Sequence, residues 1–162
     1  MTIVALLVFN LLIFGVSIGT AVLGWSATNI AGMDLGLAGW ILSILLSWGL
    51  LFISVVGNFA ITVYGAYAAA KKGLDLMGCG VLGGLAHAIV GIVMGVLQFG
   101  AGFIGLGANV LTAGDAFGSV FAGFVGVVGM GIGICLGLII YVALIFVNII
   151  NGLIGGFVGG AK

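Results

Sequence analysis

Almost the whole chain consists of apolar stretches, divided by three short polar breaks. Runs such as Ile3–Ile13 and Leu136–Ile150 do not alternate apolar and polar residues, as the strands of a membrane β-barrel would. Lipid offers no hydrogen-bond partner to backbone groups, so apolar stretches longer than about 18 residues are expected to be helices. The pattern predicts an all-α integral membrane protein, a single domain with four long helices over about 2–31, 35–71, 76–112 and 116–160.

Each polar break contains one aspartate close to a glycine. The three aspartates, Asp34, Asp75 and Asp115, are about 40 residues apart, which indicates helix–turn units of constant length. A glycine just past a helix end accepts the left-handed conformation that closes the helix, and an aspartate accepts hydrogen bonds from the free N–H groups that start the next one. We therefore predict that all three aspartates are helix N-caps, in two antiparallel hairpins with short Gly/Asp turns.

The predicted helices are longer than a bilayer requires. A helix of about 35 residues reaches roughly 52 Å, whereas the hydrocarbon core is about 30 Å thick. Tilt, extension beyond the lipid, or breaks at Gly100–Gly102 and Gly155–Gly156 would each resolve the difference. The sequence leaves these three possibilities open.

Charge is scarce, and the positive charges are grouped. Charged residues make up 4% of the chain, against about 25% in soluble domains. With four spans, Lys71, Lys72 and Lys162 lie on one side of the membrane, and the positive-inside rule places both termini and the Lys71–Lys72 turn in the cytoplasm, or within a membrane-derived particle or filament. No larger basic cluster is present, so nucleic-acid binding is not expected.

Glycine is the most informative residue after the apolar ones, at 33 of 162 positions. Many glycines are four residues apart, which places them on one helix face, where they let two backbones approach closely. The glycines predicted to pack helices are Gly15, Gly19, Gly80, Gly84, Gly91, Gly95, Gly129, Gly133, Gly137, Gly152, Gly156 and Gly160. The last two predicted helices carry glycine around most of their circumference, which leaves packing surface for neighbouring subunits. We therefore expect a large homo-oligomer.

Five polar side chains lie inside the predicted spans. Counted from the predicted cytoplasmic end, all five lie at a similar depth of roughly 14–21 Å. They are Asn10, Asn58, His87, Asn148 and Asn151. An unpaired polar group in apolar surroundings costs roughly 2–7 kcal/mol, so we expect these groups to hydrogen-bond one another in one interhelical layer. The alternative is a path for a small solute or ion in which His87 titrates.

Few residues could support catalysis or hold a metal. His87 is the only histidine, and no carboxylate lies within a predicted helix to orient it. Cys79, His87 and Cys135 include no close pair of metal ligands. We expect a non-enzymatic protein with no cofactor and no metal site.

These features favour a membrane-embedded structural subunit of a coat, shell or pilus-like filament, with copies of itself and membrane lipid as partners. The Lys71–Lys72 turn between two apolar helices resembles the hairpin pilins of conjugative secretion systems and the hairpin coat proteins of spindle-shaped archaeal viruses. That resemblance covers one hairpin, and four helices in place of two depart from it. A small-solute channel or carrier, and an accessory subunit bound to other membrane subunits, are the alternatives.

Overall fold

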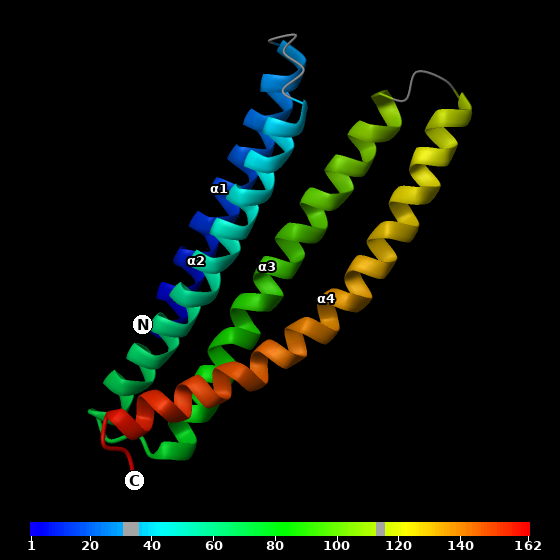
Figure 1. The fold of residues 1–162 in the computed structure, drawn as a ribbon. Coiled ribbons are helices and arrows are strands. Elements are labelled where there is room, and N and C mark those ends of the chain that lie inside the picture. Colours follow the sequence, from blue (N-terminus) through cyan, green and yellow to red (C-terminus); the bar gives the residue numbers. More distant parts are fainter. Residues whose placement is uncertain (31–35, 113–115) are drawn as a thin grey trace.

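The computed structural model describes residues 1–30, 36–112 and 116–162. They form the four helices α1 (Thr2–Ile30), α2 (Gly36–Ala70), α3 (Leu76–Thr112) and α4 (Ala116–Val158), with no strand in these ranges (Figure 1). Each helix contains a segment long and apolar enough to cross a membrane: Thr2–Gly19, Ile44–Ala70, Leu76–Ile104 and Gly126–Val158. The described residues therefore have the all-helical character that the sequence predicts, with four helices that could each span a membrane, and the helix bounds lie within two residues of the predicted ones.

The helices run without interruption through their glycine-dense points. α3 is continuous at Gly100–Gly102 and α4 at Gly155–Gly156, so helix breaks do not absorb the excess length. The 43 residues of α4 extend about 65 Å at 1.5 Å per residue, roughly twice the thickness of a hydrocarbon core. Tilt, the curvature of α4 visible in Figure 1, and extension beyond the lipid are left to accommodate that length.

Two helices end in the same way at one end of the bundle. Gly73 follows α2 with φ +94°, and the Leu74 N–H donates to the Ala69 carbonyl at 3.1 Å. Gly160 follows α4 with φ +81°, and the Ala161 N–H donates to the Gly156 carbonyl at 3.0 Å. Both are Schellman motifs, in which only glycine takes the positive φ without strain.

The bundle thus has two distinguishable ends. We call the end that holds Lys71, Lys72 and Lys162 the lysine end, and the opposite end, where α1 and α3 finish and α2 and α4 begin, the far end (Figure 1).

Contacts between helices define their relative directions. Phe9 and Thr2 of α1 lie against Gly57 and Gly65 of α2, so these two helices are antiparallel. α3 and α4 are also antiparallel, and they share the most extensive contact in the bundle. α2 and α4 run parallel, because Gly155 lies against Val63 and Gly159 against Tyr67.

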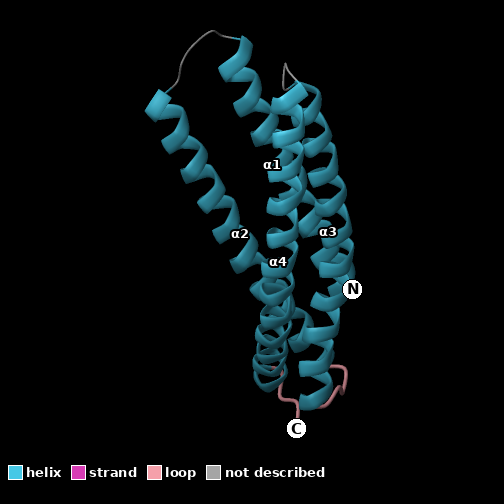
Figure 2. Ribbon diagram, turned by 90° about the vertical axis from the view of Figure 1, so that its right-hand side faces the viewer, coloured by secondary structure: helices cyan, strands magenta, loops and turns pink. Residues whose placement is uncertain are grey.

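The core lies in the half of the bundle nearer the lysine end. Leu6 of α1 is fully buried among Ala86, Val90 and Met94 of α3, with Ile61 of α2 beside them. Toward the far end the helices separate, and α2 diverges from α3 and α4 (Figure 2). The bundle is closed in one half and open in the other, and this asymmetry positions the candidate site.

Candidate functional site

An asparagine pair joins α1 to α2. The Asn10 amide nitrogen donates to the Asn58 side-chain oxygen at 2.8 Å, and the Asn58 nitrogen donates back at 3.3 Å. Each nitrogen also donates to a carbonyl four residues earlier in its own helix, at 2.8 Å in both cases. The two amides thus satisfy each other in apolar surroundings, which an isolated amide could not do without a cost.

A second polar contact joins α2 to α4. The Thr62 hydroxyl donates to the Asn148 side-chain oxygen at 3.1 Å, and both residues are buried. The Asn148 nitrogen donates to the Leu144 carbonyl at 2.9 Å. Asn151 is buried one turn away on the same helix.

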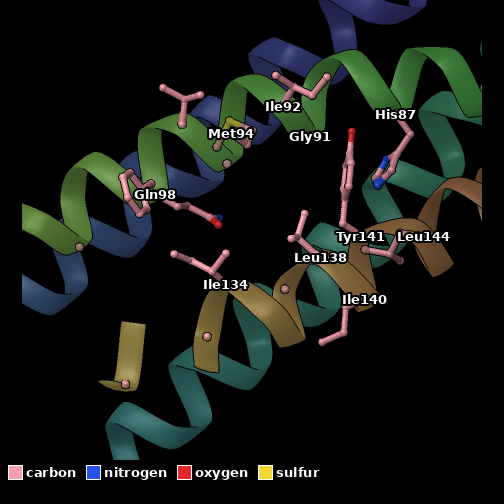
Figure 3. A pocket seen from close by; sticks show the side chains of 17 residues that line it. His87, Gly91, Ile92, Met94, Gln98, Ile134, Leu138, Ile140, Tyr141 and Leu144 are labelled. Carbon is pink, nitrogen blue, oxygen red and sulfur yellow. The ribbon is translucent and has the colours of Figure 1, made fainter. Parts of the chain in front are cut away.

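His87 lies in a third place, between α3 and α4. Its ring stacks on that of Tyr141, with centroids 6.1 Å apart and planes inclined by 28° (Figure 3). The Tyr141 hydroxyl donates to the Ala88 carbonyl, and the ring lies against Gly91, where no side chain obstructs it. His87 Nδ1 is buried without a hydrogen-bond partner among the described residues.

The five predicted polar residues therefore do not form one hydrogen-bonded layer. Asn10 and Asn58 pair with each other, Asn148 pairs with Thr62, and His87 bonds to none of the other four. Their common depth follows from residue counting, but the helix face on which each lies decides which partner it meets. The expected mutual hydrogen bonding is therefore found between Asn10 and Asn58, whereas the described contacts do not join Asn148 or His87 to this pair.

Five of the predicted packing glycines lie in the contact between α3 and α4. A Cβ at Gly80 would meet Leu153 at 2.9 Å, and one at Gly84 would meet Ile149 at 2.5 Å. A Cβ at Gly152 would collide with the Cys79 carbonyl oxygen and lie 3.1 Å from the Gly80 Cα, and one at Gly156 would lie 2.7 Å from the Cys79 Cβ. Gly91 receives the Tyr141 ring. Close backbone approach at these positions depends on the missing side chains.

Six other predicted packing glycines have no neighbouring residue of the chain over the position of the missing side chain. A Cβ added at any of them would have no neighbouring atom within 4 Å; they are Gly15, Gly19, Gly95, Gly129, Gly133 and Gly137. The last four line a groove of about 1170 Å³ between α3 and α4, which begins beside Tyr141 and His87 and continues toward the far end (Figure 3). Its other lining residues are mostly apolar, with the Gln98 side chain directed into it. We call this hollow the α3–α4 groove.

Gly160 has a different role from the one predicted. It lies beyond Val158, where α4 ends, and its positive φ makes it the terminating residue of the Schellman motif. Its spacing of four from Gly156 is therefore not the spacing of two residues on one helix face. The row of helical glycines ends at Gly156.

The predicted caps and lysines are partly described. Asp75 accepts a hydrogen bond from the Gly78 N–H at 3.0 Å, the geometry of an N-cap, whereas Asp34 and Asp115 lie outside the described residues. Lys71, Lys72 and Lys162 are all exposed. The Leu76 N–H, at the start of α3, donates to the Lys162 carbonyl at 3.2 Å, so the two chain segments at the lysine end are tied together.

Three features of the site were not predicted from the sequence. Thr62 is fully buried, but a threonine can bond its own helix, and nothing in the sequence singled it out. Tyr141 fills the space over Gly91, and Gly83 abuts the Asn148 backbone. Gly83 is not one of the predicted packing glycines, although its neighbour Gly84 belongs to a predicted row.

Among the described residues, no group of three or more His, Cys, Asp or Glu side chains could hold a metal ion. Cys79 is buried and Cys135 exposed, both as free thiols. Comparison of this chain with protein-family models, with curated proteins and with solved structures finds no match.

Proposed function

We propose that this protein is a non-enzymatic structural subunit that assembles with copies of itself in the membrane, through glycine-rich helix faces, into a coat, shell or pilus-like filament. The observation that carries the proposal is the unequal use of glycine along α3 and α4. In the closed half Gly80, Gly84 and Gly152 are covered by the opposing helix, whereas Gly133 and Gly137 face the α3–α4 groove.

Packing forces in lipid give this difference its meaning. Lipid tails are as apolar as the side chains they touch, so helices associate through close van der Waals contact and not through a hydrophobic drive. A glycine face left open forgoes that contact and still pays the conformational cost of glycine in a helix. A helix from a second copy would restore the contact that the chain itself makes in its closed half.

The proposed membrane placement follows from the positions of the charges. The three lysines lie at one end, and no charged residue occurs in the segments Thr2–Gly19, Ile44–Ala70, Leu76–Ile104 and Gly126–Val158. We propose two antiparallel hairpins that span the bilayer with the lysine end, including both termini, in the cytoplasm or on the inner side of an assembled particle.

Extraction in a mild detergent followed by electron microscopy of the purified protein tests the proposal. Particles containing many copies, in a tube, ring or lattice, are the expected result. Uniform single-chain particles would contradict it. A channel or carrier would instead be identified by solute-specific flux after reconstitution into liposomes.

A further inference from the structure

A row of side chains on α2 runs from the closed half of the bundle into the open half. Its members follow steps of four or three residues, the spacing of a continuous helix-packing face. We call it the α2 seam; it consists of Ile41, Leu45, Trp48, Phe52, Val55, Phe59, Thr62, Ala66 and Ala70. Its last three members are buried, whereas Trp48 and Phe52 are each 68% exposed. One face is thus covered at the lysine end and uncovered toward the far end.

The partner of the covered part is a face of α4. Ala66 lies against Gly155, Ala70 against Gly159, and Thr62 bonds to Asn148. Steps of four and seven residues along α4 lead from Gly155 through Asn148 and Leu144 to Gly137 and Gly133, so these positions share that face. Toward the far end this face of α4 therefore includes Gly133 and Gly137, which line the α3–α4 groove.

The residue pairing of the covered α2–α4 contact can be extended along both helices toward the far end. Gly155 lies against Val63 and Gly159 against Tyr67, in parallel helices. The offset of 92 residues in these two contacts brings Gly137 level with Leu45 and Gly133 level with Ile41, and the offset of 89 between Ala66 and Gly155 brings Gly137 level with Trp48. Large side chains on α2 thus correspond to positions without side chains on α4, a complementary pair of surfaces. The two surfaces do not meet within the chain, because α2 diverges from α4 in the open half (Figure 2).

α1 packs against α2 in the closed half. Leu6 fills the space between α2 and α3, and Phe9 lies against Gly57. The Asn10–Asn58 pair fixes α1 to α2. Closure of α2 onto its own α4 would have to disturb these contacts, whereas docking onto another copy would leave them intact.

We propose that the exposed part of the α2 seam of one copy docks into the α3–α4 groove of a neighbouring copy, and so repeats between chains the parallel α2–α4 contact made within each chain. This inference rests on the proposed self-assembly and specifies its interface. Copies inserted in one orientation keep each residue at one depth, so Leu45 of one copy meets Gly137 of the next. A contact in which each copy docks its seam into the next copy and receives the seam of a different one is heterologous, and it generates a ring if it closes and a filament if it does not.

Disulfide cross-linking between two tagged chains tests the interface. Both chains carry Cys79→Ala and Cys135→Ala; one also carries Leu45→Cys and the other Gly137→Cys, and the pair is oxidised in native membranes. Leu45 and Gly137 are both exposed within the chain, so these substitutions leave its own packing intact. A reducible product carrying both tags is expected, and the pair Ile41→Cys with Gly133→Cys is expected to give the same product.

A matched control uses the same depth on another helix face. Leu46 neighbours Leu45, is also exposed, and lies off the seam. Because a disulfide requires Cα atoms within about 7 Å, Leu46→Cys with Gly137→Cys should give on the order of tenfold less product.

Three results would overturn the inference. Absence of the two-tag product from an oligomeric protein would refute the interface and leave the proposed self-assembly standing. A chain carrying both Leu45→Cys and Gly137→Cys that cross-links only within itself would show closure of α2 onto its own α4. A protein that is monomeric in the membrane would refute both proposals.

Discussion

The hydroxyl of Thr62 in α2 donates a hydrogen bond to the side-chain oxygen of Asn148 in α4, and both residues are buried. This bond lies on the face where the two parallel helices α2 and α4 meet, on the lysine-end side of the region in which they separate. It is the polar element of the α2–α4 contact, and its loss should weaken the closed half of the bundle.

Thr62→Val removes the hydroxyl and keeps the branched shape. Interhelical hydrogen bonds of this kind contribute about 0.6–1.7 kcal/mol in membrane proteins, so the free energy of unfolding should fall by about 1 kcal/mol. Unfolding by SDS in mixed micelles, followed by circular dichroism of the helices, measures it. Thr62→Ser retains the donor and should lose less. A loss of stability in Thr62→Ser together with none in Thr62→Val would show that the methyl group, not the hydrogen bond, stabilises the contact.

The asparagine pair between α1 and α2 should behave as a coupled unit. Asn10→Leu leaves the Asn58 side-chain oxygen without its 2.8 Å donor, and Asn58→Leu leaves Asn10 without the returned bond. An unpaired buried amide costs about 1–3 kcal/mol, whereas replacing both partners by apolar groups can be nearly neutral. We expect the double variant to unfold less readily than the sum of the single losses predicts. Strict additivity in the double-mutant cycle would contradict the pairing.

Covered and open glycines should respond differently to alanine. A Cβ at Gly152 meets the backbone of Cys79 and Gly80, which cannot rotate away, so Gly152→Ala should lower the free energy of unfolding by about 2 kcal/mol. Gly133→Ala meets no atom within 4 Å and should change the stability of the single chain by less than about 1 kcal/mol. Both variants are measured in a detergent that separates the copies. Similar losses at the two positions would mean that Gly133 is also covered within the chain.

Substitution of His87 is expected to raise the free energy of unfolding, in contrast to the substitutions above. His87 Nδ1 has no hydrogen-bond partner among the described residues, and a buried unsatisfied polar atom costs about 1–3 kcal/mol. His87→Phe keeps an aromatic ring beside Tyr141 and removes the polar atom, so the free energy of unfolding should rise by about 1 kcal/mol. A clear loss of stability would show that His87 has a bonded partner in the assembled protein that the single chain does not supply.

The sequence predicts the helices well because local chemistry determines where they begin and end. Asp75 and Gly73 mark the boundary between α2 and α3, and the apolar stretches on either side of it form helices long enough to cross a membrane. Gly160 is the exception: its spacing from Gly156 suggests a packing face, yet its position after the last helical turn makes it a terminating residue.

The site is less predictable because glycine spacing identifies a face and not its partner. Gly80 and Gly84 have the same spacing as Gly133 and Gly137, but only the first pair is covered within the chain. The difference arises from the separation of α3 and α4 toward the far end and from the curvature of α4, which are tertiary properties (Figure 1). Likewise, residue counting gives the depth of Asn148, but only the crossing of α2 and α4 brings Thr62 to it.

The mass of the intact particle, compared between the natural chain and the double variant Gly133→Ile/Gly137→Ile, tests self-assembly most directly. Native mass spectrometry from a mild detergent or from lipid nanodiscs should give multiples of the chain mass for the natural protein. The double variant places side chains in the α3–α4 groove at two positions where an added Cβ has no neighbouring atom within 4 Å, and it should shift toward single chains with unchanged helix content. A natural protein that is monomeric under all these conditions, or a variant whose oligomers are as large and as stable as those of the natural chain, would contradict the account.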